Sequence, residues 1–288
     1  GDRRREVRRQ RRKTDLDGPF AAAAARSASV LRLLSGAGNG GVAAAASSSL
    51  PEVPGGVRNW DYRYCWLRDA ALAIDALMSL GVHDQAMDFW RWLERVAARG
   101  PLRVLYRIDG TSAPSERELD LPGYLGARPV RCGNGARDQR QHDVFGYLLD
   151  AAWRCQVAMR SPHPRLGPVL QRLANAAAAG WRRPDRGIWE VRRGPLRHVH
   201  SLLMCWVALD RALLLQGRGW LDGDGAWWRA QRARVRRELL QHGFDRERGT
   251  FLQAIGAPQL DATALAVPLV GLLPADDPRV LSTLAAVE

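Results

Sequence analysis

The apolar residues of this chain recur mostly at every third or fourth position, which is the spacing of one face of a helix. Glycine, proline and polar residues separate these stretches and mark where one helix ends and the next begins. No repeat with a period of about 20 to 50 residues is visible. The pattern predicts an all-α protein with about nine helices, at residues 18–34, 67–80, 83–99, 139–160, 165–181, 198–216, 220–242, 260–273 and 277–288.

Residues 60–66 break the helical spacing. Aromatic residues stand there at every second position, namely Trp60, Tyr62, Tyr64 and Trp66. The alternation indicates an extended segment, and helical spacing starts at Leu67. A segment that turns into a helix at Arg68 and Asp69 is suited to hold a sugar, because aromatic faces cover the apolar side of the ring while the arginine and the carboxylate bind adjacent hydroxyls. An aromatic core strand with solvated charges explains the same residues about equally well.

Residues 101–131 are dense in glycine and proline and are predicted to be mainly loop. A loop this long inside a compact domain usually has a function. We therefore expect Asp109, Glu118 and Tyr124 to shape the mouth of a binding site.

Residues 184–192 are a second stretch that could take part in catalysis. In this stretch Glu190 directly follows Trp189 after a glycine-containing turn. Burial of a carboxyl against an indole raises its pKa, and a carboxyl protonated at neutral pH can act as a general acid. The commoner fate of a glutamate in an arginine-rich chain is an ion pair. The candidate partners for such a pair are Arg186, Arg192 and Arg193.

The histidines offer weaker signals. His142 and Asp143 are adjacent in a predicted helix, so their side chains do not face the same side and a catalytic dyad is not expected. His198 and His200 have the wrong spacing for one helix face and lack a third ligand, so no metal site is expected.

The chain has 288 residues, 46% of them hydrophobic, which is enough for a sizeable core. Its net charge is +13, and 43 residues are Lys or Arg, with Lys13 the only lysine. Such a charge suits nucleic acid. However, the arginines are spread along the whole chain and alanine and glycine are also abundant, as in a coding bias. Nucleic-acid binding is therefore a distant hypothesis, which a steep salt dependence of DNA affinity would support.

The cysteines Cys65, Cys132, Cys155 and Cys205 lie far apart and form no CxxC pair. Neither a zinc site nor a disulfide framework is indicated, and reduced, mostly buried thiols are the simplest account. No apolar segment follows the basic N-terminus, and no run is expected to be long enough to span a bilayer. We expect a cytoplasmic protein without a membrane partner.

The stretch WDYRYCWLRDA at residues 60–70 resembles a segment of glycoside hydrolase family 15, which includes glucoamylases and bacterial trehalase-like enzymes. The resemblance extends over about residues 18–288 and includes Leu-Pro-Gly-Tyr at 121–124. Arg107 stands where the family more often has glycine. The resemblance implies an (α/α)6 barrel of twelve helices and inverting, exo-acting hydrolysis of α-glucosidic bonds. No cofactor is expected.

The resemblance also implies roles for particular residues. Arg68 and Asp69 match the pair that binds the outer hydroxyls of the terminal glucose, and Glu190 matches the general acid. The expected partner is an α-glucoside, either a malto-oligosaccharide or trehalose. The residues expected to wall the pocket are Trp60, Trp66, Trp189 and Tyr124.

The predicted helices number about nine against the family's twelve, and no segment matches the acidic one that carries the family's general base. We expect residues 1–17 to be a basic tail or linker remnant and residues 18–288 to form a partial barrel domain. The chain is then a fragment of a longer enzyme, an inactive relative, or a barrel completed by a second chain. The alternative function is a non-catalytic carbohydrate-binding relic. The oligomeric state is left open.

Overall fold

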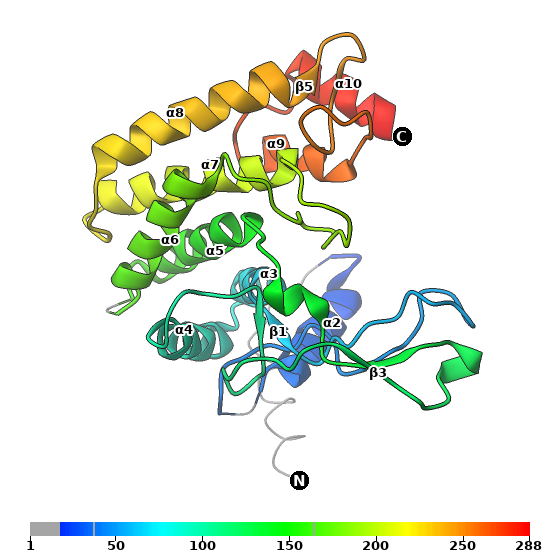
Figure 1. Cartoon of the computed structure of the whole chain (residues 1–288). Helices are drawn as coiled ribbons and strands as arrows, with labels where there is room; N and C mark the ends of the chain where they lie inside the picture. Colours follow the sequence, from blue (N-terminus) through cyan, green and yellow to red (C-terminus); the bar gives the residue numbers. More distant parts are fainter. Residues whose placement is uncertain (1–17, 37, 164) are drawn as a thin grey trace. The chain divides into compact units, whose positions relative to one another are not determined.

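A computed structural model describes residues 18–36, 38–163 and 165–288 (Figure 1). The expected tail at residues 1–17 lies outside this range. The chain divides into two compact units. Unit 1 is Gly1–Asp138 with Val157–Arg160, and unit 2 is Gln139–Gln156 with Ser161–Glu288. Helices dominate both, and the described strands form only two-stranded pairs, so the all-α prediction is confirmed.

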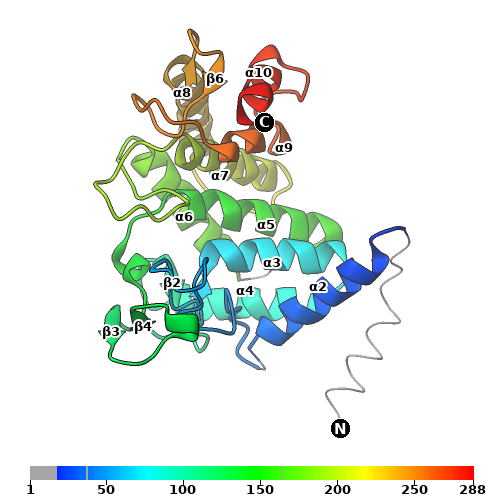
Figure 2. The same cartoon turned by 90° about the vertical axis from the view of Figure 1, so that its right-hand side faces the viewer.

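Unit 1 contains the helices α2 (Ala21–Leu34), α3 (Leu67–Ser79) and α4 (His83–Ala97). Helix α3 packs against both α2 and α4, and Figure 2 shows α3 and α4 running alongside each other with α2 inclined to them. Gly81, with φ +72°, lets the chain reverse between α3 and α4. The aromatic residues of α4 are fully buried, so this helix contributes much of the hydrophobic core of the unit. They are Phe89, Trp90 and Trp92.

Short strands form the irregular part of unit 1. Strand β1 (Cys65–Trp66) pairs antiparallel with β2 (Leu105–Tyr106), and β3 (Arg117–Leu119) with β4 (Val130–Cys132). The 3-10 turns η1 (Tyr124–Gly126) and η2 (Gly135–Asp138) complete this region. Most of residues 101–131 is loop, as predicted, and its short strands pair with β1 or with each other.

Unit 2 is built around α7 (Val199–Gly217). Helices α6 (Gly167–Gly180) and α8 (Gly225–His242) pack on it. Helix α5 (Asp143–Met159) approaches it so closely at Gly146 that a Cβ there would lie 2.3 Å from the Met204 carbonyl oxygen. Because α7 has neighbours on several sides, 13 of its 19 residues are buried.

Helix α7 corrects one expectation, because it is long and apolar enough to cross a membrane by length and composition. It is the one such helix among the described residues, and 72% of its apolar window is buried inside the protein. A helix that is apolar all round is typical of the centre of a helical protein as well as of a membrane span.

The C-terminal part of unit 2 begins with β5 (Phe244–Asp245) and β6 (Thr250–Phe251), which pair antiparallel. It ends with η3 (Ala262–Leu265), α9 (Ala266–Leu269) and α10 (Pro278–Val287). The helix predicted at 260–273 is thus much shorter. Asp261 is the N-cap of η3, so the helical segment starts at residue 262. Gly271, with φ +82°, follows the last turn of α9 and marks its end.

Candidate active site

The Arg-Asp pair lies in the first turn of α3. Strand β1 leads directly into this helix, and the backbone N–H of Leu67 donates to the Val104 carbonyl at 3.0 Å, which fixes the start of the turn. Arg68 is buried, whereas 43% of the Asp69 side chain is exposed. Arg68 Nε lies 3.6 Å from Asp69 Oδ2. The helix N-terminus favours the negative charge, so Asp69 presents a partly exposed carboxylate beside a covered guanidinium.

The aromatic residues predicted around this pair have different surroundings. Trp66 is 2% exposed and belongs to a small core with Tyr64 and Leu105. Trp60 is partly buried under the guanidinium of Arg131, which lies 4.4 Å from its ring centre. Tyr124, on η1, is 59% exposed. Their roles at a sugar pocket stay predictions.

Arg131, on β4, organises the loops of unit 1. Its guanidinium lies among oxygen atoms from two other segments, namely those of Val57, Asn59, Glu116 and Glu118. Its backbone N–H donates to Ser49 Oγ at 2.7 Å, and Ser48 Oγ donates to its carbonyl at 2.7 Å. One residue therefore joins the segments on both sides of the aromatic stretch and holds Trp60 in place.

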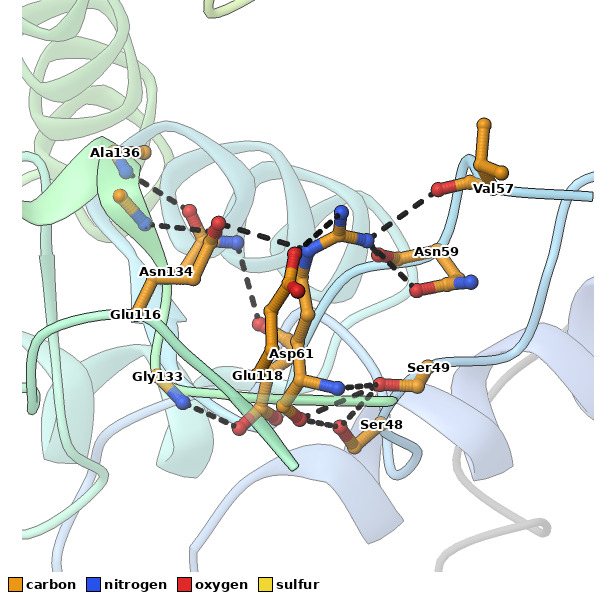
Figure 3. A network of polar contacts seen from close by, with 12 residues as sticks. Ser48, Ser49, Val57, Asn59, Asp61, Glu116, Glu118, Gly133, Asn134 and Ala136 are labelled. Atoms are coloured by element: carbon orange, nitrogen blue, oxygen red, sulfur yellow. Dashed lines mark hydrogen bonds and ion pairs between the residues drawn. The ribbon is translucent and has the colours of Figure 1, made fainter. Parts of the chain in front are cut away.

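Asp61 is the buried anchor of the aromatic stretch. Its carboxylate accepts two hydrogen bonds from Arg63 at 2.8 Å, one from Tyr64 Oη at 3.1 Å and one from Gly133 N at 3.1 Å (Figure 3 shows the last). Burial by itself raises the pKa of Asp61, but the hydrogen bonds from Arg63 and Gly133 outweigh burial and hold the pKa below its usual value. Asp61 is thus an ionised structural residue, which sequence reasoning did not identify.

In unit 2, Glu190 stands in a loop closed at its base by paired backbone hydrogen bonds of 2.9 Å between Asp185 and Leu196. Gly187, with φ +64°, makes the turn, and the Glu190 N–H donates back to its carbonyl at 3.2 Å. Glu190 itself has φ +53°, a left-handed conformation that is rare and strained for a residue with a Cβ. Such conformations persist where surrounding contacts impose them, and they cluster at functional sites.

Asp185 fastens this loop to the rest of unit 2. Its Oδ2 accepts from the His142 N–H at 2.7 Å and from Ser201 Oγ at 2.8 Å. Burial raises the pKa of Asp185 to about 6, and these hydrogen bonds offset only part of that effect. Burial, assisted by the charge of Arg140, lowers the pKa of His142 to about 4, so this imidazole is neutral at pH 7.

Trp189 presents an exposed aromatic face next to Glu190. The residue is 59% exposed, and its Nε1–H donates to Asp261 Oδ2 at 2.7 Å. Asp261 is itself fixed, because its Oδ1 accepts from Thr263 N at 2.9 Å. An exposed indole held by its N–H on a buried carboxylate can serve as a platform for a sugar ring.

Two glutamines reach Glu190 from the segment before α5. Gln141 Nε2 donates to Glu190 Oε1 at 3.1 Å and to Gln139 Oε1 at 3.0 Å. Gln139 Nε2 donates to the Glu190 carbonyl oxygen at 3.2 Å. The structure therefore brings Trp189 and Glu190 together with residues that sequence reasoning missed, and no local pattern marks the glutamines as their partners. Among the described residues, no group of three or more His, Cys, Asp or Glu side chains could hold a metal ion.

Several glycosidases of known structure have the same fold. One, described as a wild-type glycosidase, matches 92% of this chain and 68% of its own with a TM-score of 0.70 at 22% identity. A bacterial glucoamylase complexed with acarbose matches 97% of this chain and 41% of its own with a TM-score of 0.68 at 15% identity. The fold is thus that of helical-barrel glycosidases, and the predicted barrel class is confirmed.

The family model of glycosyl hydrolases family 15 matches residues 19–288, and the chain belongs to this family. It is 43% identical over 277 residues to a trehalase of Mycobacterium tuberculosis and 41% identical over 280 residues to one of Mycolicibacterium smegmatis. A trehalase of Thermoplasma volcanium is 34% identical over 264 residues. The matches cover 94%, 94% and 91% of this chain. The chain spans only 41 to 42% of the length of these relatives.

Proposed function

We propose that this chain forms part of an exo-acting, inverting α-glucosidase in which Glu190 is the general acid. The position of Glu190 carries the proposal. It is partly buried, follows the exposed indole of Trp189 and has a strained backbone conformation. The buried Gln141 donates to its carboxyl group, and Gln139 donates to its backbone carbonyl. A carboxyl held in this way can deliver a proton in a fixed direction.

In the proposed reaction, the bond between C1 of the terminal glucose and the glycosidic oxygen breaks while Glu190 protonates that oxygen. A water molecule attacks C1 from the opposite face, and a second carboxylate removes a proton from this water. The products are glucose of inverted configuration and a sugar with a free hydroxyl. We assign no residue of this chain as the second carboxylate.

Arg68 and Asp69 are the proposed ligands of the terminal glucose. The partly exposed carboxylate of Asp69 can accept hydrogen bonds from sugar hydroxyls, and the buried guanidinium of Arg68 holds a positive charge beside it. Trp60, supported from behind by Arg131, would cover an apolar sugar face.

Trehalose is the substrate we favour over malto-oligosaccharides. The relatives at 43% and 41% identity are named trehalases, and they match 94% of this chain. The alternative is a domain that binds an α-glucoside without hydrolysing it.

The test is glucose release from trehalose and from maltose by the purified chain. Glu190→Gln removes the transferable proton but keeps the size of the side chain, so we expect a loss of at least about 100-fold in turnover. Glu247→Gln, at an exposed glutamate in the β5–β6 turn, is the matched control and should behave like the wild type.

Binding separates the two functions. Calorimetry should show that Glu190→Gln still binds trehalose when turnover is lost. A folded wild-type chain that binds trehalose but releases no glucose would support the binding function instead. Undiminished turnover in Glu190→Gln would remove Glu190 from the role of acid.

A further inference from the structure

Gln141 is buried, and both hydrogens of its amide are directed to acceptors. One points to Glu190 Oε1 at 3.1 Å and the other to Gln139 Oε1 at 3.0 Å. Gln139 in turn holds the Glu190 carbonyl oxygen at 3.2 Å. The two side chains therefore grip both the carboxyl group and the backbone of Glu190, and we call this pair the amide clamp.

The segment that carries the amide clamp is itself fixed to the Glu190 loop. The Arg186 N–H donates to the Arg140 carbonyl at 3.0 Å, and the His142 N–H donates to Asp185 at 2.7 Å. These bonds leave the clamp little freedom to move away from Glu190. They also help to explain how Glu190 keeps its φ of +53°.

We propose that Gln141, supported by Gln139, is a positioning residue that determines which oxygen of Glu190 carries the proton delivered to the substrate. This inference rests on Glu190 being the general acid. An amide N–H seeks the acceptor oxygen of a neutral carboxyl, which is the one without the hydrogen. When Glu190 carries its proton as the acid, Oε1 takes that role, and the proton is then carried by Oε2.

The same hydrogen bond acts during the reaction. The Oε2–H bond breaks as the proton passes to the glycosidic oxygen, and the electron pair stays on the Glu190 carboxylate. The bond between C1 and the glycosidic oxygen breaks in the same step, so the leaving sugar departs as a neutral alcohol. Because hydrogen bonds to an ionised acceptor are about twice as strong as neutral ones, the Gln141 N–H stabilises the carboxylate as it forms.

The leaving group provides the test. Trehalose needs a proton from the acid, whereas α-glucosyl fluoride releases fluoride with little proton assistance. Gln141→Met keeps the length of the side chain but removes the donor. We expect kcat for trehalose to fall about 10- to 100-fold while kcat for the fluoride changes less than about threefold. Gln139→Met should show the same selectivity with a smaller loss.

Gln156→Met is the matched control, because Gln156 is an equally buried glutamine near the other end of α5. It should leave the ratio of the two activities unchanged. A Gln141→Met protein that loses both activities equally would show a merely structural role and overturn the inference. If trehalose hydrolysis is lost in Glu190→Gln but intact in Gln141→Met, the proposed function stands and this inference fails.

A second measurement does not depend on turnover. The side-chain amide signals of Gln141 can be assigned by NMR from their absence in Gln141→Met. They should shift in Glu190→Ala, since the hydrogen-bond acceptor is removed. They should stay in place in Glu247→Ala. If the chemical shifts of the Gln141 amide are unchanged in Glu190→Ala, the inference is also overturned.

Discussion

A single carboxyl group, that of Asp185, connects three segments of unit 2. It accepts from the backbone before α5 and from Ser201 on α7, and its own backbone closes the Glu190 loop. Burial raises the pKa of Asp185 to about 6, so ionisation of this carboxyl group lowers the stability of the folded protein. The stability of the loop that carries Glu190 therefore depends on pH through Asp185, which takes no part in the proposed reaction.

Asp185→Asn should make stability less dependent on pH. The pKa of Asp185 is raised from 3.8 to about 6 on folding. The wild type is therefore fully stabilised below pH ~4 and loses about 3 kcal/mol as the pH rises through 6. Relative to the wild type, the variant should gain about 2 kcal/mol in the free energy of unfolding between pH 4.5 and pH 7.5.

Urea unfolding of both proteins at the two pH values measures this gain. His142 is present in both proteins. The effect of Asp185 is therefore the difference between the two proteins in how the free energy of unfolding changes with pH. Asp222→Asn, at an exposed aspartate of the same unit, should show no gain. A constant difference between Asp185→Asn and the wild type would contradict the prediction.

Among the elements, the turn at Gly187 has little tolerance for change. Gly187 has φ +64°, and a Cβ there would lie 2.8 Å from the ring of His198. Gly187→Ala should therefore lower the free energy of unfolding by about 1–3 kcal/mol, from both the left-handed backbone and the contact with the ring.

Gly194 offers a control within the same loop, because its φ lies outside the left-handed region and a Cβ added there would have no atom within 4 Å. Gly194→Ala should change stability by no more than about 0.5 kcal/mol. Thermal unfolding of the two variants makes the comparison. Equal losses of stability would show that the left-handed turn at Gly187 does not restrict this position.

The helices were predictable because helical spacing is a local signal. Helices α3 and α4 begin at Leu67 and His83, as expected from the spacing alone. The aromatic stretch and Trp189–Glu190 also stood out, since their residues are neighbours in sequence. Their partners did not, because Gln141 and Glu190 are separated by 49 positions, and His142 and Asp185 by 43. Contacts of this kind depend on how helices pack, which a local pattern does not encode.

For the chain as a whole, the net charge of +13 could be taken as a sign of nucleic-acid binding. Several of its arginines are engaged with carboxylates of the same chain. Arg211 bonds both Asp150 and Asp210, each at 2.6 Å, and Arg279 bonds Asp277 at 2.7 Å. These pairs do not change the excess of 43 basic over 30 acidic side chains. A nucleic-acid surface, however, needs such cations gathered on one face, and the arginines are spread along the whole sequence.

We therefore expect no specific affinity for duplex DNA. An electrophoretic mobility assay at about 150 mM salt should show no retention at micromolar protein. Tight binding whose affinity falls steeply with rising salt would contradict this expectation and revive the nucleic-acid hypothesis.

The contacts of Arg131 also have a consequence for the order of events during folding. Its hydrogen bonds to Asn59 and Ser48 join residues 72 and 83 positions apart. Closing such loops costs chain entropy before any contact can offset it, so these bonds are expected to form after the folding transition state. Bonds absent from the transition state slow unfolding without speeding folding. We therefore expect Arg131 to affect how long the ordered loops around Trp60 persist more than how quickly they form.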